Sequence, residues 1–383
     1  MPGQRPAPTT AAQPLPDEHT RLLPAAAPAA APQQTPWPMV ITLMTSTIAI
    51  SVGLINFNRY LMQPGRFPYP AALTMTHMIF CSVLSGVLRL ACPGLFPTVV
   101  SGNLKLDARF YLKGVFPIAV FFATTLILSN MVYAHLSIAF IQMLKETGVV
   151  TTYILSLMTG LEIFSIRHLQ VIVCLLVGAA LATAGELHFS WIGFAIQMSS
   201  QISDCSRIVL QSIMLDGHKM DAMSYVYLVS PVCFATLAIV LGVMRLLPAE
   251  SVPTSLAIPQ ATLIHEWAWI VLANCALAFC LNLSSTLLIQ KSGPMIYIFT
   301  GVLKDIVAVL SGVFIIQDVV TMLQIVAFSL QIVGIFTWGL LKDDPSKFEN
   351  GILPGLFHHA QRLLTSSRQA DKNCAESRLA KAA

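Results

Sequence analysis

Six charged side chains lie inside long apolar stretches of this sequence, where ions are costly. They form three local pairs: Lys145 with Glu146, Asp204 with Arg207, and Lys304 with Asp305. Each charge costs about 2.5–3.5 kcal/mol near the centre of a membrane helix, so six charges without a role would be hard to carry. A bound phosphate can offset the cost of a buried lysine, because it replaces lost water with charge-assisted hydrogen bonds. We therefore expect the two lysines to be anion ligands.

The three pairs differ in their expected geometry. Asp204 and Arg207 are three residues apart, so they share a helix face and are predicted to form a structural ion pair. Arg207 could alternatively reach the membrane interface from a helix end. Neighbouring residues on a helix point about 100° apart, so Glu146 and Asp305 are not expected to face the lysines beside them. These two acids should instead balance cationic groups across a cavity.

Long apolar helices must carry these charges. Of the 383 residues, 55% are hydrophobic and 10% are charged, and the mean hydropathy is +0.72. Soluble domains carry about 25% charged residues, so the composition excludes a soluble enzyme. Apolar runs of about 20 residues can each span a membrane, and they predict an all-α polytopic membrane protein with ten transmembrane helices. The ten runs lie at residues 39–60, 70–92, 112–132, 136–157, 168–185, 189–213, 223–246, 267–289, 293–315 and 319–341.

An internal repeat relates the two ends of this helical region. QMLKETGVV (142–150) and GVLKDIVAV (301–309) both place Leu-Lys-acid in mid-span, and Gly178 and Gly334 each lie sixteen residues after an acid. Each half then holds five helices. Because five is an odd number, corresponding helices cross the membrane in opposite directions, which predicts an inverted repeat.

The inverted repeat also predicts where a substrate would bind. The halves would be residues 39–185 and 189–341, and carriers of this kind bind their substrate near the midplane where the halves meet. Lys145 and Lys304 should then enter one central cavity from opposite sides.

The two ends of the chain have the composition of tails. Residues 1–38 hold ten prolines without periodicity and are predicted to be disordered, and residues 342–383 mix charged with polar residues. The transporter domain would therefore span 39–341. Ten spans put both tails on the side whose loops carry most of the loop Lys and Arg residues, so both tails are predicted to be cytosolic.

The N-terminal tail contains EHTRLLP (18–24), which has the form of an acidic dileucine sorting signal at Glu18–Leu23. A sorting adaptor could read it in the cytosol, although such patterns also arise by chance in tails. The tail has no serine and carries two acids, whereas plastid transit peptides are rich in serine and poor in acids. We therefore expect the Golgi or another endomembrane rather than a plastid envelope.

Other polar groups have two open interpretations each. His77 is either a hydrogen-bonded core histidine or a cavity residue. Asn130 and Asn282 could each bond a sugar hydroxyl or link two helices. The eight cysteines show no CxxC spacing, so disulfides, a metal site or a cofactor are not expected. The net charge of +4 comes from the loops and requires no nucleic-acid partner.

Five segments carry motifs in a definite order along the chain. They are INFNRYLMQPGRFPYPAALTMTHM (55–78), LSIAFIQMLK (136–145), DCSRIVLQSIML (204–215), FCLNL (279–283) and KSGPMIYIFTGVLKD (291–305). Each is short, but together the five resemble the triose-phosphate translocator and nucleotide-sugar transporter families of the drug/metabolite transporter superfamily. The resemblance covers all ten predicted spans and implies a ten-helix carrier.

The resemblance also implies which residues bind substrate. In plastid members the lysines of helices four and nine hold phosphate, and a basic residue of helix one helps to close the site. The corresponding positions here are Lys145, Lys304 and Arg59. Plastid members continue Lys-Arg in helix nine and have Tyr-Asn-Gln in helix eight, whereas this chain has Asp305 and a Leu-Asn-Leu sequence around Asn282. The endomembrane branch of the family is therefore the closer match.

These observations predict a secondary-active antiporter that exchanges nucleotide sugars or sugar phosphates for another anion across an endomembrane. The first alternative is a plastid-type sugar-phosphate/phosphate translocator. The others are a proton-coupled metabolite exporter, with Glu146 or Asp305 as proton carrier, and a non-transporting membrane scaffold. An enzyme is not expected.

Overall fold

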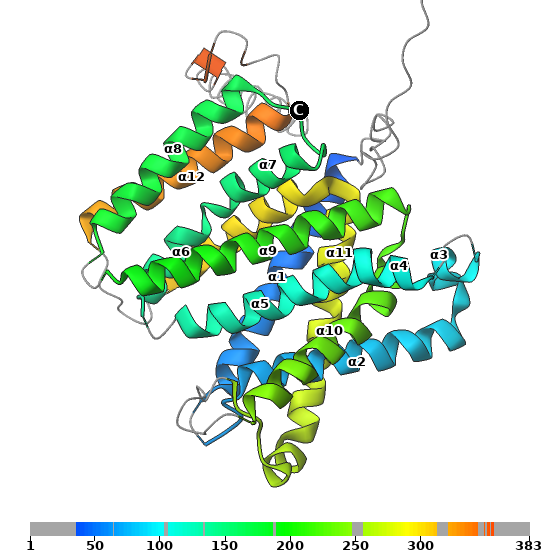
Figure 1. Ribbon diagram of the computed structural model, residues 1–383. Coiled ribbons are helices and arrows are strands. Elements are labelled where there is room, and N and C mark those ends of the chain that lie inside the picture. The colour runs from blue at the N-terminus through cyan, green and yellow to red at the C-terminus, as the bar shows by residue number, and fades with distance from the viewer. Residues whose placement is uncertain are drawn as a thin grey trace, which may run out of the picture. The chain divides into compact units, whose positions relative to one another are not determined.

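The computed structural model shows the hydrophobic region as packed helices (Figure 1). The described residues are 36–63, 65–102, 106–132, 135–186, 189–246, 256–311, 321–343, 348, 351–352 and 354–355. Within these ranges every regular element is a helix. The longer helices are α1 (Trp37–Leu61), α2 (Pro70–Ala91), α5 (Phe116–Val132), α6 (Ile138–Lys145), α7 (Gly148–Met158), α8 (Ile166–Ala184), α9 (Trp191–Gly217), α10 (Ala222–Met244), α11 (Ala261–Ser311) and α12 (Met322–Asp343). Short elements between α2 and α5 are η2 (Pro93–Leu95), α3 (Pro97–Val100), α4 (Ala108–Phe110) and the π-helical turn η3 (Tyr111–Val115).

Seven helices in the described part are long and apolar enough to cross a membrane. They are Pro38–Leu61, Pro70–Ala91, Ala108–Val132, Ile166–Ala184, Ala222–Met244, Thr262–Asp305 and Met322–Leu341. Repeated spans of this kind make the chain a multi-pass membrane protein. The count of ten stays a prediction, because α6 and α7 are short, α9 carries many polar side chains, and α11 is one continuous element here.

α11 is 51 residues long, and its backbone is not helical at Gly293, where φ is 80° and ψ is 172°. Only glycine adopts a positive φ of this kind readily. Pro294 follows, at the start of a new helical limb where its missing N–H is tolerated. The bend separates a first limb, which contains Asn282, from a second limb, which carries Lys304. It falls at the first residue of the predicted ninth helix.

The predicted helix over residues 136–157 is divided in the structure. α6 ends at Lys145, Glu146 and Thr147 form a turn, and α7 begins at Gly148. The predicted span is therefore interrupted by a turn near its centre, and whether it crosses the membrane as one span stays a prediction. The lysine and the acid lie at a helix break, and broken helices are frequent at the binding sites of membrane carriers.

α8 and α12 pack against each other through reciprocal contacts (Figure 1). A Cβ atom at Gly178 of α8 would lie 2.6 Å from Cγ of Gln331 on α12. A Cβ atom at Gly334 of α12 would lie 2.9 Å from Cδ2 of Leu175 on α8. The contacts are symmetric: Gln331, which meets Gly178, lies three residues before Gly334, and Leu175, which meets Gly334, lies three residues before Gly178. Small residues of this kind let membrane helices approach closely.

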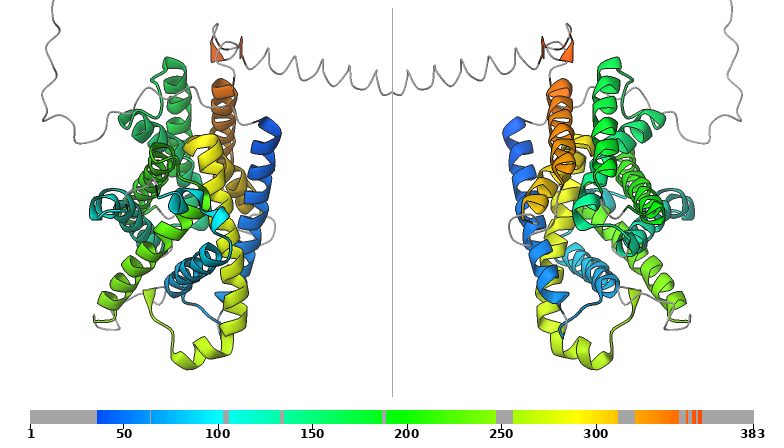
Figure 2. Two further views of the ribbon diagram at one scale, coloured as in Figure 1. Left: turned by 90° about the vertical axis from the view of Figure 1, so that its right-hand side faces the viewer. Right: turned by 90° about the vertical axis from the view of Figure 1, so that its left-hand side faces the viewer.

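The remaining helices gather around α9 and α11. α9 lies between α5 and α7, and α1 runs beside α11 (Figures 1 and 2). α2 packs on α10. One buried cluster joins five helices, with Met78 from α2, Ile118 from α5, Ile208 from α9, Val229 from α10 and Phe279 from α11. This cluster includes α9 and α11, which carry Arg207 and Lys304.

Asp221 ties the segment after α2 to the start of α10. Its carboxylate accepts hydrogen bonds from the amides of Thr98 and Ser224, and its own amide donates to the Thr98 hydroxyl. Partial burial raises the pKa of Asp221, but the hydrogen bonds outweigh burial and leave the pKa below its usual range. The ionised carboxylate therefore stabilises the fold above its unfolded pKa, and this contribution is lost as the pH falls through the folded pKa.

Most of the two predicted tails, including EHTRLLP (18–24), lies outside the described residues. α1 already begins at Trp37 and α12 continues to Asp343, so each helix enters the predicted tail by two residues. Within the predicted C-terminal tail, Phe348 is buried, and Ile352 packs against a cluster of α7, α8, α11 and α12 side chains. Part of that segment is therefore packed against the helical domain.

Candidate functional site

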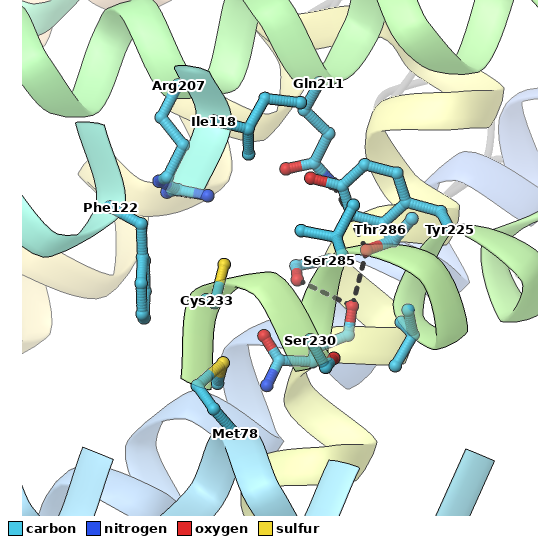
Figure 3. Close-up of a pocket in the computed structure, with 13 residues that line it drawn as sticks. Met78, Ile118, Phe122, Arg207, Gln211, Tyr225, Ser230, Cys233, Ser285 and Thr286 are labelled. Atoms are coloured by element: carbon cyan, nitrogen blue, oxygen red, sulfur yellow. Dashed lines mark hydrogen bonds between the residues drawn. The ribbon is translucent and has the colours of Figure 1, made fainter. Parts of the chain in front are cut away.

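A small polar cavity lies among α2, α5, α9, α10 and α11 (Figure 3). Its volume is about 50 Å³. Its wall consists of Met78, Ile118, Phe122, Arg207, Gln211, Tyr225, Val226, Val229, Ser230, Cys233, Asn282, Ser285 and Thr286. A guanidinium, several hydroxyls and two amides therefore line a space that is otherwise bounded by apolar side chains.

Arg207 directs its guanidinium toward the cavity (Figure 3). Its Nε and Nη2 donate hydrogen bonds of 3.2 and 2.8 Å to Oδ1 of Asp204, one turn earlier on α9. Its Cζ lies 6.0 Å from the centre of the Phe122 ring. The predicted ion pair is thus present, and Arg207 lies within α9 rather than at either end of it. Because a guanidinium has five N–H donors, Arg207 can hold Asp204 and still bind an anion.

Uncharged hydrogen-bonding groups form the part of the wall that α9 and α11 share. Gln211 Nε2 donates to Oγ1 of Thr286 at 3.2 Å, and the hydroxyls of Ser285 and Thr286 donate to the Asn282 carbonyl oxygen. Asn282 Nδ2 donates to Sγ of Cys81 at 3.6 Å. Hydroxyl and amide groups both donate and accept hydrogen bonds, so this wall is suited to a hydroxylated ligand.

Lys304 lies near this cavity but does not line it. Its Nζ is 3.4 Å from Oδ1 of Asp305, so the expectation that this acid would not face its own lysine is wrong. The long lysine side chain bends around the helix to reach its neighbour. Lys304 is also close enough to Asp204 and Tyr297 to interact electrostatically, and both of these residues interact with Arg207. Lys304 and the cavity arginine therefore belong to one charge network.

Lys145 and Glu146 join this network from the break between α6 and α7. Glu146 is 1% exposed, and it lies close enough to Lys145, Lys304 and Asp305 to interact electrostatically with all three. Gly148 allows α7 to approach α9 at this break, because a Cβ atom there would collide with an α9 side chain. The structure thus brings together the two Leu-Lys-acid segments, although Lys145, like Lys304, does not line the cavity of Figure 3.

Other predicted site residues lie apart from the cavity. His77 is buried, its Nε2 is 2.6 Å from Oδ1 of Asn274, and Asn274 donates to Oδ1 of Asn58 at 2.9 Å. These bonds link α1, α2 and α11. They agree with the interpretation of His77 as a hydrogen-bonded core histidine. Arg59 is exposed in the last turn of α1. Asn130 donates to a carbonyl of its own helix at 2.7 Å.

Sequence reasoning gave no substrate contact to Gln211, Tyr225, Ser285 or Thr286, and it gave Arg207 only a structural pairing. A signal was nevertheless present in the sequence. Gln211 lies four residues after Arg207, and Thr286 lies four residues after an asparagine. Polar residues four apart share one face of a helix, and a polar face on an apolar membrane helix indicates a cavity or a buried partner.

These features define a multi-pass helical membrane protein with an internal cavity whose wall includes a partly buried arginine. The profile of the Triose-phosphate Transporter family matches residues 40–339. Because the match covers more than half of the chain, this protein belongs to the triose-phosphate transporter family. It is accordingly a membrane protein from a family of transporters.

Individual relatives agree with the family match. Two Arabidopsis thaliana proteins, each named "Probable sugar phosphate/phosphate translocator", are 30% identical to this chain, and the alignments cover 80% and 76% of it and 88% and 84% of the relatives. UDP-uronic acid transporter 1 of the same plant is 26% identical over 79% of this chain and 95% of its own length. A solved structure described only as "Crystal structure of protein" matches with a TM-score of 0.50 and 13% identity, covering 79% of this chain and 97% of its own. That last likeness bears on the fold alone.

Proposed function

We propose that this protein is a secondary-active antiporter that exchanges nucleotide sugars or sugar phosphates for another anion across the Golgi or another endomembrane. The observation that carries this proposal is the cavity in which the guanidinium of Arg207 faces hydroxyl and amide groups. Guanidinium groups bind phosphate strongly, and hydroxyl and amide groups suit a sugar. The names of the relatives, which refer to sugar phosphates and to UDP-uronic acid, support the same class of substrate.

Two groups of residues would divide the work of binding. Lys145 and Lys304 would hold the phosphoryl group as point charges, while Glu146 and Asp305 balance them when the site is empty. Arg207 would share this role, and the uncharged wall would contact the rest of the substrate. Lys304 and Arg207 share electrostatic contacts to Asp204 and Tyr297, which supports a single continuous site.

The cavity must enlarge before a substrate of this class can enter. Its volume is about 50 Å³, whereas pockets for small organic ligands measure about 300–1,000 Å³. We infer that the structure corresponds to a closed arrangement, from which the two halves rock apart. Arg59 is exposed at the end of α1 in this arrangement and does not line the cavity, so it would contact the substrate only in another arrangement of the carrier.

The rocking halves would be the two five-helix repeats, 39–185 and 189–341. Ten helices are obtained when α6 and α7 count as one broken span, α9 as one, and α11 as two limbs that meet at Gly293. The reciprocal packing of Gly178 and Gly334 supports a twofold relation between α8 and α12. Both tails would face the cytosol, where an adaptor could read the dileucine segment.

Two alternatives can be separated by their physical requirements. A membrane scaffold needs no buried charges, so the network around Lys304 and Glu146 argues against it. A plastid-type exchanger would use inorganic phosphate as the counter-anion. Relatives named as phosphate translocators make phosphate a necessary member of any exchange panel.

Exchange in proteoliposomes tests the proposal. Vesicles that contain the full chain are preloaded with one nucleoside monophosphate or with inorganic phosphate, and uptake of labelled nucleotide sugars and sugar phosphates is measured. At least one pair should show uptake that rises when the counter-anion is inside. Protein-free vesicles provide the background. Uptake at the background rate for every pair would contradict the proposed function.

A further inference from the structure

Glu146 is a buried acid without a hydrogen-bonding partner. It is 1% exposed, and neither of its carboxylate oxygens has a hydrogen bond to any group in the described part of the chain. Burying an ionised carboxylate without hydrogen bonds is very costly. Such a group needs either a proton or an opposite charge in direct contact.

The charged neighbours of Glu146 do not provide that contact. Lys145 precedes it at the end of α6, and its ammonium makes no hydrogen bond or ion pair with Glu146 within the described structure. From α11, Lys304 is in electrostatic range but is paired with Asp305 at 3.4 Å. Asp305 is itself negatively charged, so it disfavours the ionised form of Glu146.

The other helices packed near Glu146 offer little further charge. α9 contributes Asp204, which is paired with Arg207, and the neutral thiol of Cys205, whose Sγ donates to the Gly148 carbonyl oxygen. α12 contributes the uncharged Gln331, which donates to a carbonyl of α6. α8 carries three ionisable side chains. Arg167 and His168 lie in its first turn, and Cys174 lies further along the helix.

The charge of the site therefore depends on Glu146. When Glu146 is ionised, the two lysines and the two neighbouring acids cancel. When Glu146 carries a proton, Lys145 remains as an excess cation and attracts an anion. Anion binding and protonation of Glu146 then favour each other by the same factor, as linked equilibria require.

We propose that Glu146 is a proton-binding site and that this carrier moves a proton together with its anionic substrate. The proton comes from water on the side to which the site is open, binds a carboxylate oxygen as the anion binds the lysines, and returns to water on the opposite side when the anion leaves. No bond of the substrate forms or breaks. The coupling rests on the proposed transport function, whereas the proton site can be tested without any substrate.

Infrared spectroscopy tests the proton site directly. The full chain in a detergent without ester groups, whose carbonyls would overlap the band, is compared from alkaline to acidic pH with Glu146→Gln, which keeps the shape of the protonated acid. Glu266→Gln is the matched control, because Glu266 is exposed at the start of α11. As the pH is lowered, wild type and control should gain the carbonyl stretch of a protonated carboxylic acid that Glu146→Gln lacks. A spectrum that Glu146→Gln leaves unchanged would overturn the proposal.

Proton flux tests the coupling. Vesicles with a pH-sensitive dye but no exchange anion inside receive UDP-glucose outside, so that no proton leaves with a counter-anion. UDP-glucose is used because its phosphoryl groups do not titrate near neutral pH as phosphate monoesters do. Wild type and Glu266→Gln should acidify the interior as UDP-glucose enters, and Glu146→Gln should not. Uptake of UDP-glucose by the wild type without acidification would overturn the coupling. If UDP-glucose enters neither these vesicles nor vesicles preloaded with a nucleoside monophosphate, the nucleotide-sugar part of the proposed function fails, and the infrared result still decides whether Glu146 binds a proton.

The empty carrier provides a third readout. In Glu146→Gln the empty site keeps an uncompensated cation, which opposes its return across the membrane. Efflux of UDP-glucose without external substrate should therefore fall at least about tenfold below wild type, while exchange continues. A Glu146→Gln variant that leaks as fast as wild type or faster would contradict this account.

Discussion

The Gly178→Ala substitution tests the close packing of α8 on α12. The added Cβ would lie 2.6 Å from Gln331 Cγ and 3.2 Å from the Ala327 carbonyl oxygen, so neighbouring atoms must move. Overpacking of this kind costs about 1–3 kcal/mol, whereas replacing glycine by alanine within a helix contributes about 0.5–1 kcal/mol of stability. The net destabilisation should be about 0–2.5 kcal/mol.

Gly339→Ala is the matched control, because it lies on α12 and a Cβ there would meet no atom within 4 Å. Gly339→Ala should therefore gain only the stability that alanine has over glycine within a helix. Thermal unfolding of both full-length variants in detergent, followed by the loss of monodisperse protein, compares them directly. We expect Gly178→Ala to unfold below wild type and Gly339→Ala at or above it. Equal stability of the two variants would refute the reciprocal packing.

A displaced Gln331 should also affect the site. Its Nε2 donates at 3.3 Å to the Met143 carbonyl oxygen, two residues before Lys145. Gly178→Ala should therefore lower substrate uptake more than its loss of folded protein accounts for, and Gly339→Ala should not.

Three further predictions concern the cavity, the topology and the sorting of the chain. Arg207→Gln removes the cation of the cavity and leaves its partner acid unpaired, so uptake should fall at least about tenfold; unchanged uptake would remove Arg207 from the site. Tags at positions 20 and 375 should be accessible from the cytosol, and a tag at position 255 from the lumen, as judged by selective permeabilisation; a luminal tag at 20 would contradict the ten-helix topology. Replacing both leucines of EHTRLLP (18–24) with alanine should shift the protein among endomembranes in fluorescence imaging, and an unchanged distribution would make the motif a coincidence.

The sequence was sufficient where a local rule decides the structure. The three-residue spacing of Asp204 and Arg207 predicted their ion pair, which the structure contains at 2.8 Å. Apolar runs predicted a polytopic membrane protein, and the family motifs agreed with the profile match. These inferences needed only helix geometry and the length of a membrane span.

The sequence was insufficient where contacts between distant helices decide the structure. The break between Lys145 and Gly148 depends on how closely α7 packs on α9, and neither spacing nor hydropathy reports that distance. The contact of Lys304 with Asp305 depends on a flexible side chain that helix geometry alone does not orient. The cavity was missed because its wall comes from five helices, and no local motif contains it.

The central claim is that an anion binds at the two midspan lysines, and the affinity of single-lysine variants tests it most directly. Lys145→Ala and Lys304→Ala are reconstituted beside Lys113→Ala, a control whose lysine is exposed on η3. Competition by unlabelled substrate then measures affinity for the anion that the wild type exchanges. Each midspan variant should lose about 1.5–3 kcal/mol of binding, roughly ten- to hundredfold in affinity, and Lys113→Ala should match the wild type. Near wild-type affinity in either midspan variant would contradict the account.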